Sequence, residues 1–333
     1  MPNQVRWGIL STANINKALL EPIRKAERSE LFAVASRDQG RAEAYAQREG
    51  IVRAYGSYEA MLADPEVDAV YISLPNALHA EWTVKAAEAG KHVLCEKPLV
   101  VTLDEFDRVE AAAQASGVHV VEAFMYLHHP QTQRARQLID EGRLGALQLV
   151  NSWFNFYLPP ERSENIRLSS ELTGGSLWDV GVYPNSAAIY MAQPQQPERV
   201  WASQIVGESG VDVAMRAQVA FSGAAVGQIS SGFRTPFREG LFLVGDEATL
   251  HIPEPWKPGL TGKDSAMTLT GRDGKAETII TAAVDPYLCE VQAMEASILD
   301  GAAPVVSLAL SRVFLRTALA IYASARSGEV MAV

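Results

Sequence analysis

The sequence has little of what marks secreted, nucleic-acid-binding or membrane-spanning proteins. Its two cysteines, Cys95 and Cys289, lie far apart, which favours free thiols in a reducing compartment over a disulfide framework. Lysine and arginine form no cluster and the formal net charge is -10, which disfavours a nucleic-acid partner. Because neither a basic leader nor a long apolar run occurs, we expect no export signal, no membrane span and a cytoplasmic location.

The length and composition indicate a globular protein of two domains. The chain has 333 residues, of which 48% are hydrophobic and 20% charged. A chain of this length divides into about two domains of ordinary size. We expect residues 1–122 to form the first domain and residues 123–333 the second.

The first domain alternates short apolar runs with amphipathic helical patterns. Strand-like runs such as "VRWGIL" and "DAVYISL" are each followed by a helical segment such as "HAEWTVKAAEAG". This order is typical of a parallel sheet with right-handed crossovers and helices on both faces. The first domain is therefore predicted to be a doubly wound α/β domain.

The second domain changes to an alternation of apolar and polar residues. Runs such as "LQLVNSWFNFYL" and "VAMRAQVAFS" follow one another with only turns between, which predicts an α+β domain with an open, predominantly antiparallel sheet. Helical patterns occur at 174–191, 286–300 and 307–327. We expect these three helices to cover one face of the sheet and to leave the other face open for a second subunit.

The turn after the first strand lies where doubly wound proteins bind dinucleotides. It keeps the glycine fingerprint only in part: Gly8 is expected in the tight turn, Ser11 replaces the second glycine and Ala13 the third. Its backbone amides are expected to face a pyrophosphate, and an ordinary strand-to-helix turn is the alternative. The cofactor-binding candidates here are Gly8, Ser11, Thr12, Ala13, Asn14 and Ile15.

The ends of the next strands supply further cofactor-binding candidates. Ser36 and Arg37 stand where NAD-binding proteins carry Asp or Glu, and a hydroxyl beside a guanidinium suits the 2′-phosphate of NADP. A solvated surface arginine is the alternative. The third predicted strand is followed by Leu74, Pro75, Asn76 and His79. Of these, Asn76 suits a helix cap at least as well as a ligand contact.

Two motifs carry a resemblance to a known family. "HVLCEKPL", with Glu96, Lys97 and Pro98, and "GGSLWDVGVYPN", with Asp179 and Tyr183, stand about eighty residues apart. In this order and spacing, and with the segment that holds Pro75, Asn76 and His79, they resemble the Gfo/Idh/MocA family of glucose-fructose oxidoreductase, inositol dehydrogenase and rhizopine catabolism proteins. The resemblance covers essentially the whole chain.

The resemblance implies a fold, a cofactor and a substrate class. The family joins a Rossmann domain to an α+β domain, uses a nicotinamide cofactor, acts on sugars or cyclic polyols, and forms dimers or tetramers through the open sheet. In the family the peptide between Lys97 and Pro98 is cis. Tyr183, where inositol dehydrogenases carry His, is similar to the branch of glucose-fructose oxidoreductase, dihydrodiol dehydrogenases and NADP-dependent xylose dehydrogenases. That branch agrees with NADP as the cofactor, with NAD as the alternative.

One segment departs from the family. In "FMYLHHPQ", Leu127 and His128 replace a common Arg and Phe, so the contact of that arginine cannot be carried over. No metal is expected, because Glu122, His128 and His129 match no ligand spacing.

Lys97 and Tyr183 suit the oxidation of a hydroxyl. A free tyrosine, with a pKa of about 10, is a poor base at neutral pH, and a nearby ammonium lowers that pKa. Asp179 lies one helical turn before Tyr183 and is expected to orient Lys97 or to bind a substrate hydroxyl. Without Lys97, a buried tyrosine in a glycine-led helix would be the simpler interpretation. Pro184 costs about 3 kcal/mol in a helix interior and marks a conflict there.

The remaining candidates concern the cofactor and the substrate. The predicted catalytic residues are Lys97, Tyr183 and Asp179; Glu96 and Lys97 join the cofactor set; Tyr157, Phe233 and Arg234 are the substrate candidates. We expect an NADP(H)-dependent oxidoreductase that oxidises an aldose such as xylose at C1 to a lactone. The alternatives are a reductase of a keto or dicarbonyl sugar, a dihydrodiol dehydrogenase, and a non-catalytic NADPH-binding sensor.

Overall fold

The computed structural model describes residues 4–162 and 164–333, which form two compact units. The first unit runs to His128 and includes Asp285–Ser311, and the second comprises His129–Val284 and Arg312–Val333. The expected division at residue 122 is therefore incomplete, because the segment Asp285–Ser311 returns to the first unit.

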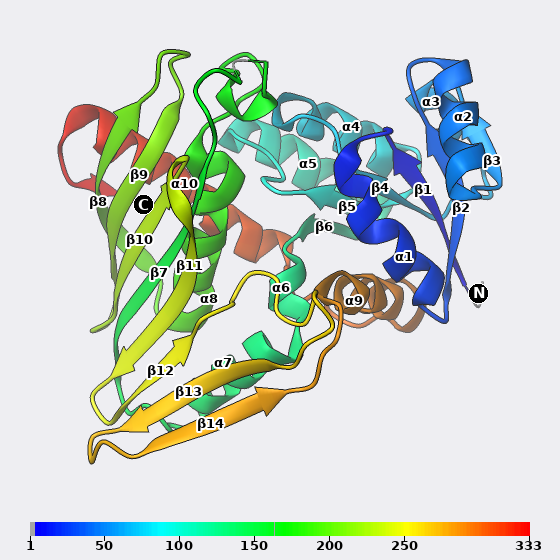
Figure 1. Cartoon of the computed structure of the whole chain (residues 1–333). Coiled ribbons are helices and arrows are strands. Elements are labelled where there is room, and N and C mark those ends of the chain that lie inside the picture. Colours follow the sequence, from blue (N-terminus) through cyan, green and yellow to red (C-terminus); the bar gives the residue numbers. More distant parts are fainter. Residues whose placement is uncertain (1–3, 163) are drawn as a thin grey trace. The chain divides into compact units, whose positions relative to one another are not determined.

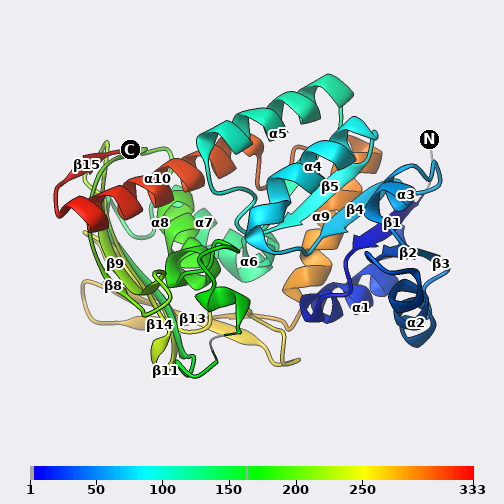
Figure 2. The ribbon, with the colours of Figure 1, turned by 90° about the horizontal axis from the view of Figure 1, so that it is seen from above.

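The first unit is built on a six-stranded parallel sheet in the order β3-β2-β1-β4-β5-β6 (Figure 1). Helices α4 and α5 lie on one face and α1 and α9 on the other (Figures 1 and 2). The strands are β1 Val5–Leu10, β2 Ser29–Ala35, β3 Arg53–Tyr55, β4 Ala69–Ile72, β5 His92–Glu96 and β6 Val120–Ala123. The helices are α1 Lys17–Lys25, α2 Gln39–Glu49, α3 Tyr58–Leu62, α4 His79–Glu88, α5 Leu103–Ser116, α6 Met125–His128 and α9 Pro286–Asp300. The doubly wound prediction is confirmed.

The strand order of this sheet reverses between β1 and β4. All four residues of β4 are buried, as expected for a central strand covered on both faces. In such a sheet, ligands bind beyond the carboxyl ends of the strands at the point of reversal. The turns that follow β1 and β4 are therefore the expected location of a cofactor site.

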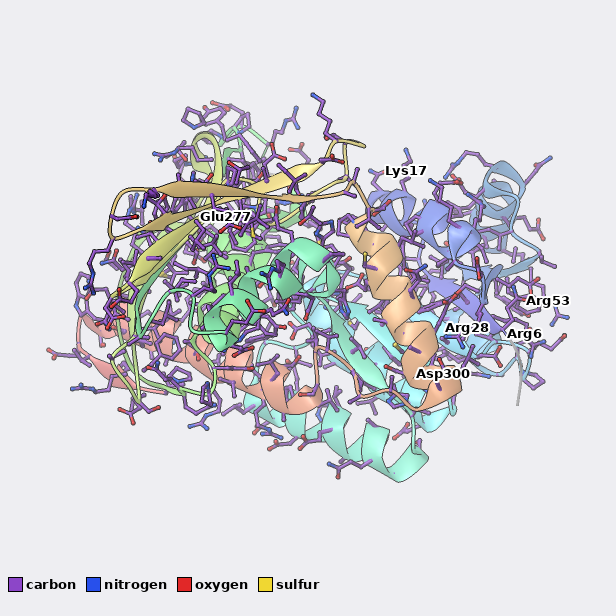
Figure 3. All side chains as sticks on the ribbon, turned by 90° about the horizontal axis from the view of Figure 1, so that it is seen from below. Arg6, Lys17, Arg28, Arg53, Glu277 and Asp300 are labelled. Atoms are coloured by element: carbon purple, nitrogen blue, oxygen red, sulfur yellow. The ribbon has the colours of Figure 1, made fainter. Side chains whose placement is uncertain are left out.

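Helix α9 belongs to the first unit because polar side chains join it to the beginning of β2. Arg28 donates both guanidinium nitrogens to Asp300, at 2.9 and 2.8 Å (Figure 3). The Ser29 hydroxyl donates to Glu295 at 2.7 Å inside the unit. The prediction that residues 286–300 cover the second sheet is therefore wrong. The sequence pattern identifies an amphipathic helix but not the surface against which it packs.

The second unit is built on a nine-stranded sheet in the order β14-β13-β12-β11-β7-β10-β9-β8-β15. Among the described pairings of this second sheet, only β7–β10 is parallel, so the predominantly antiparallel prediction is confirmed. The strands are β7 Leu147–Tyr157, β8 Pro197–Val206, β9 Asp212–Phe221, β10 Val226–Gly232, β11 Arg234–Gly245, β12 Ala248–Ile252, β13 Ser265–Gly271, β14 Ala276–Thr281 and β15 Met331–Ala332. The helices are α7 Pro130–Asp140, α8 Val182–Ala192 and α10 Leu308–Ser327, with a π-helical turn at Leu177–Gly181.

Helices α8 and α10 cover one face of this sheet (Figure 2). The Ser152 hydroxyl of β7 donates to the Pro184 carbonyl of α8, and the backbone N–H of Ala202 in β8 donates to the Ser324 hydroxyl of α10. Helix α10 is long and apolar enough to cross a membrane by length and composition, contrary to expectation, and 44% of its most apolar stretch is buried inside the structure. A packed core helix passes the same test.

Candidate active site

The turn after β1 keeps a glycine-like backbone at a serine. Ser11 has a φ of 136°, a region that non-glycine residues rarely adopt and that is often found at functional sites. Its buried hydroxyl lies 2.7 Å from that of Ser73, which in turn donates to the Asn16 amide oxygen at 2.6 Å. The roles of Ser73 and Asn16 were not predicted. Ser73 lies about sixty residues from both Ser11 and Asn16 in sequence, and no sequence pattern indicates a hydrogen bond over that separation.

Gly8 does not form the tight turn that the sequence predicts. It lies within β1, and a Cβ there would approach the Met61 sulfur at 2.9 Å, so the glycine makes room for α3. The exposed part of the segment lies further along the chain: Thr12 and Ala13 are half-buried, and Asn14 and Ile15 are exposed. These four residues can be reached by a ligand, whereas Gly8 cannot.

The two candidates after β2 differ in exposure. Ser36 is 5% exposed, and its backbone N–H donates to the Tyr55 carbonyl at 3.0 Å. Arg37 is exposed. The next residue, Asp38, caps α2 by accepting the N–H of Arg41 at 2.7 Å. Arg37 is thus an accessible cation just beyond the carboxyl end of β2.

His79 holds the turn after β4 through both of its ring nitrogens. The Nδ1 atom of His79 lies 2.7 Å from the Pro98 carbonyl oxygen, and its Nε2 atom lies 2.7 Å from that of Leu74. Burial lowers the pKa of His79, so the ring is neutral and donates to one carbonyl at a time. The side chain is 1% exposed and joins the two turns, and it does not offer a nitrogen to a ligand. Asn76 begins a 3-10 turn and does not cap α4, whose N-cap is Leu78.

Lys97 directly follows β5, and the two residues after it, Pro98 and Leu99, are held by hydrogen bonds to His79 and Glu122. The Lys97–Pro98 peptide is cis, as the resemblance implies, and Lys97 is half-buried. Two residues later, the Leu99 N–H donates to Glu122 of β6 at 3.0 Å. Burial raises the pKa of Glu122 to about 7, and the charge of Lys97 opposes that rise. Glu122 therefore holds the lysine turn, a role that the sequence did not predict.

Glu96 faces a cluster of buried acidic and phenolic groups. The Tyr71 hydroxyl donates to Glu96 at 2.5 Å. Burial raises the pKa of Glu290 on α9 well above its usual range, and the charge of Glu96 adds to the effect. Burial and Glu96 together raise the pKa of Tyr287. Since Tyr287 and Glu290 come from the far end of the chain, only the folded structure reveals this neighbourhood.

Asp179 lies in the π-helical turn that precedes α8. It accepts the Nε–H of Arg167 at 2.6 Å, in an ion pair whose arginine side chain is 42% exposed. The backbone makes this approach possible, because a Cβ at Gly174 would lie 2.5 Å from the Arg167 carbonyl oxygen. A glycine is therefore required at position 174, because the chain segment that carries Arg167 passes close to it on the way to Asp179. Single π-helical turns are frequent at functional sites.

Asp212 of β9 anchors the beginning of the same turn. It is 3% exposed and accepts the Ser176 hydroxyl at 2.7 Å, the Leu177 N–H at 2.9 Å and the Tyr322 hydroxyl at 2.6 Å. Gly175 has a φ of 121°, and a Cβ there would lie 2.2 Å from the carboxylate. The two glycines thus fit two different neighbours, Arg167 and Asp212.

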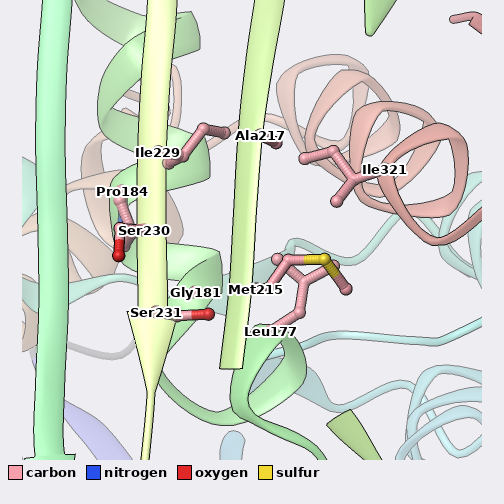
Figure 4. A pocket seen from close by; sticks show the side chains of 9 residues that line it. All are labelled: Leu177, Gly181, Pro184, Met215, Ala217, Ile229, Ser230, Ser231 and Ile321. Carbon is pink, nitrogen blue, oxygen red and sulfur yellow. The ribbon is translucent and has the colours of Figure 1, made fainter. Parts of the chain in front are cut away.

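Tyr183 lies in the first turn of α8, and its ring packs among aromatic side chains. It is 7% exposed, with ring centroids 5.5 Å from Phe154 and 5.8 Å from Trp256. Pro184 follows in α8, and because the π-helical turn Leu177–Gly181 runs directly into this helix, the proline lies inside a continuous helical segment, as the sequence predicts. A small cavity of about 10 Å³ lies beneath Gly181 and Pro184 and is lined mainly by apolar side chains (Figure 4).

The three substrate candidates lie in different environments. Phe233 is fully buried and packs against Phe156 in the core, so its prediction as a pocket residue is wrong. Alternation along β7 places the exposed Tyr157 on the sheet face opposite Phe154. Arg234 donates to the Leu158 carbonyl at 2.7 Å and is half-buried. The aromatic residues beside Tyr183 are thus different ones from those predicted.

The segment that departs from the family ends the first unit. Leu127 is fully buried, and both ring nitrogens of His128 are buried without a hydrogen-bond partner in the described residues. Burial lowers the pKa of His128 to about 4, so the ring packs as a neutral side chain. Among residues 4–162 and 164–333, no group of three or more potential ligands is placed to hold a metal.

The candidate residues thus form two sets, one in each unit. The first contains Lys97 with Glu96, Glu122 and the turns after β1 and β4, and the second contains Asp179 and Tyr183 with Arg167. The first set offers a lysine beside a dinucleotide-type turn. The second offers a tyrosine and an ion-paired carboxylate at the beginning of one helix.

Comparison with known proteins agrees with this division. Residues 5–124 match the family model described as "Oxidoreductase family, NAD-binding Rossmann fold", and residues 132–251 match the "GFO/IDH/MocA C-terminal domain". A D-xylose 1-dehydrogenase (NADP(+)) of Haloferax volcanii is 40% identical over 98% of both chains. A trans-1,2-dihydrobenzene-1,2-diol dehydrogenase of Danio rerio is 32% identical over 76% of both chains.

A solved structure extends the comparison to the whole fold. A 3-ketoreductase from Actinomadura kijaniata, in complex with NADP and TDP-benzene, superimposes with a TM-score of 0.87 at 29% identity, covering 97% of this chain and 98% of that one. Both family models match in order, and one relative is 40% identical along nearly its whole length, so the chain belongs to the Gfo/Idh/MocA family of oxidoreductases.

Proposed function

We propose that the chain is an NADP-dependent dehydrogenase that oxidises an aldose such as D-xylose at C1 to a lactone. The observation that carries this proposal is Tyr183, held in the first turn of α8 against Phe154 and Trp256, in a chain that retains Lys97 directly after β5. The 40% identity to a D-xylose 1-dehydrogenase supports the substrate class.

The residues of the first unit fit NADP. The exposed segment after Ser11 offers backbone amides at the carboxyl end of β1, where a pyrophosphate binds in proteins of this topology. Arg37 is exposed at the carboxyl end of β2, and the carboxylate of the next residue, Asp38, caps α2. A guanidinium at this position suits a 2′-phosphate.

The residues support a proton transfer coupled to hydride loss. When bound, NADP accepts the hydride that leaves the sugar C1. Tyr183 accepts the proton of the C1 hydroxyl as the carbon–oxygen double bond forms. The two sequence motifs alone motivate the second part of the proposal, in which the ammonium of Lys97 favours the phenolate form of the tyrosine. Asp179, paired with Arg167, binds a hydroxyl away from the reacting carbon.

The same residues serve the reverse direction, which gives the second candidate function. A ketoreductase of the same fold binds NADP, which favours reduction of a keto sugar as the alternative. Assays of NADP reduction and of NADPH oxidation across a panel of pentoses, hexoses and keto sugars separate the two. Absorbance of the freshly purified protein at the nicotinamide band reports whether a cofactor stays bound.

Two variants test the mechanism on whichever sugar the panel identifies. Lys97→Ala and Tyr183→Phe are each expected to lower kcat by about 100-fold or more, since one positioned acid–base group contributes at least that much. Glu88→Gln, at an exposed position of α4, serves as the control. Turnover at the wild-type rate in both variants contradicts the mechanism.

We also propose that the uncovered face of the second sheet joins two copies of the chain, in a dimer or tetramer located in the cytoplasm. Trp201 is 47% and Ile205 54% exposed, and alternation along β8 places both on the face away from α10. Exposed apolar residues on a sheet face are typical of an interface. Trp201→Arg is expected to yield monomers in light scattering, and an unchanged mass contradicts this interface.

A further inference from the structure

A carboxylate interrupts an apolar row on the covered face of the second sheet. Along β11, Leu243 and Leu241 pair with Val150 and Ser152 of β7, and both leucines are buried. The next inward position in the same row is Glu239, which pairs directly with Phe154. Side chains that pair directly lie on the same face of a sheet, so Glu239 shares the face on which α8 packs.

Glu239 lies beside the aromatic side chains that hold Tyr183. Phe154 contacts Tyr183 on one side and Phe237 on the other, at a centroid distance of 6.1 Å. Phe237 is 64% exposed, so the surface formed by Phe154 and Phe237 is open at one edge. A half-buried carboxylate next to one half-buried and one exposed aromatic ring suits a polyol, since the rings pack against its C–H groups and the carboxylate accepts its hydroxyls.

The carboxylate of Glu239 has hydrogen-bonding capacity for an additional partner. The backbone N–H of Trp256 donates a hydrogen bond to the carboxylate, while the indole N–H of the same residue donates to the Trp153 carbonyl, and a carboxylate has about four lone-pair sites. Burial and the charge of Glu254 raise the pKa of Glu239 to about 7, while Lys257 opposes the rise. A carboxylate is expensive to place on an apolar face without enough donors, and a hydroxyl-rich ligand supplies them.

We propose that Glu239 is a substrate-binding residue that accepts a hydroxyl of the sugar beside Tyr183, over the surface formed by Phe154 and Phe237. The inference rests on the proposed function. It adds a specificity element from β11 that neither family motif contains.

The test measures kcat and KM for D-xylose at saturating NADP, at a pH of about 8, where a group with a pKa near 7 is ionised. Glu239→Ala is expected to raise the KM for D-xylose about tenfold or more, the loss expected for a hydrogen bond to a charged group. Glu239→Gln keeps an acceptor for the backbone N–H of Trp256 and is expected to raise that KM several-fold. Glu88→Gln, at an exposed position of α4 in the first unit, is the control.

Two further measurements separate binding from folding. The melting temperature and the KM for NADP are expected to stay at wild-type values in Glu239→Gln. Wild-type KM for D-xylose in both Glu239 variants overturns the inference, as does an alanine variant whose melting temperature falls while the glutamine variant behaves as wild type. If the wild-type protein turns over no sugar of the panel, the proposed function itself fails, and this inference fails with it.

Discussion

Replacement of Glu122 by glutamine is expected to stabilise the protein at alkaline pH. Burial raises the pKa of this 4%-exposed carboxyl from 4.5 to about 7. Because the folded state holds the proton more tightly than the unfolded state, the stability that Glu122 contributes is complete below pH 4.5 and is lost as the pH rises through about 7. The difference corresponds to about 3 kcal/mol of unfolding free energy.

Glutamine removes this cost while keeping an acceptor for the Leu99 N–H. About 2 kcal/mol of the loss is expected to fall between about pH 5.5 and about pH 8.5, so urea unfolding at these two values is the assay. Between these two pH values the free energy of unfolding of the wild type should fall by about 2 kcal/mol more than that of Glu122→Gln. The control Glu88→Gln should show the same fall as the wild type. A glutamine variant that is destabilised equally at both pH values refutes the reasoning.

Two more predictions follow from the cofactor turn and the π-helical turn. Arg37→Ala is expected to raise the KM for NADP by about 10- to 100-fold while leaving that for NAD unchanged, because a phosphate loses one charged hydrogen-bonding partner; equal losses for both cofactors would assign Arg37 to another role. Asp212→Ala, which leaves three donors without an acceptor, is expected to lower the free energy of unfolding by about 3 kcal/mol, and Tyr322→Phe by about 1 kcal/mol, in urea titrations. Equal losses in the two variants would contradict the anchoring role of Asp212.

The sequence predicts the first unit well because its signals are local. Each strand of a parallel sheet is an apolar run and each crossover helix has its own amphipathic pattern, so β1, β4 and β5 and their helices follow from short stretches. Helix α9 shows the limit of that reasoning. Its bounds are predicted, but its packing depends on Arg28 and Ser29, more than 260 residues away in sequence.

The candidate site divides in the same way. Lys97, Asp179 and Tyr183 are found because motifs carry them. Arg167 lies in the short 3-10 helix Ile166–Leu168, which has no sequence periodicity, and its contact with Asp179 depends on the close approach that Gly174 permits. The wrong prediction for Phe233 has a similar cause, because an aromatic residue at a strand end looks the same in sequence whether it lines a pocket or fills the core.

The most direct test of the proposed reaction follows the hydrogen on C1 of the sugar. D-Xylose carrying deuterium at C1 is incubated with the wild-type protein and NADP, and the mass of the reduced cofactor is measured by mass spectrometry. The proposed reaction predicts NADPH that is heavier by the one deuterium transferred, with the lactone as co-product. Neither the deuterated NADPH nor the lactone is expected with Tyr183→Phe. NADPH of ordinary mass, or unchanged transfer in the phenylalanine variant, contradicts it.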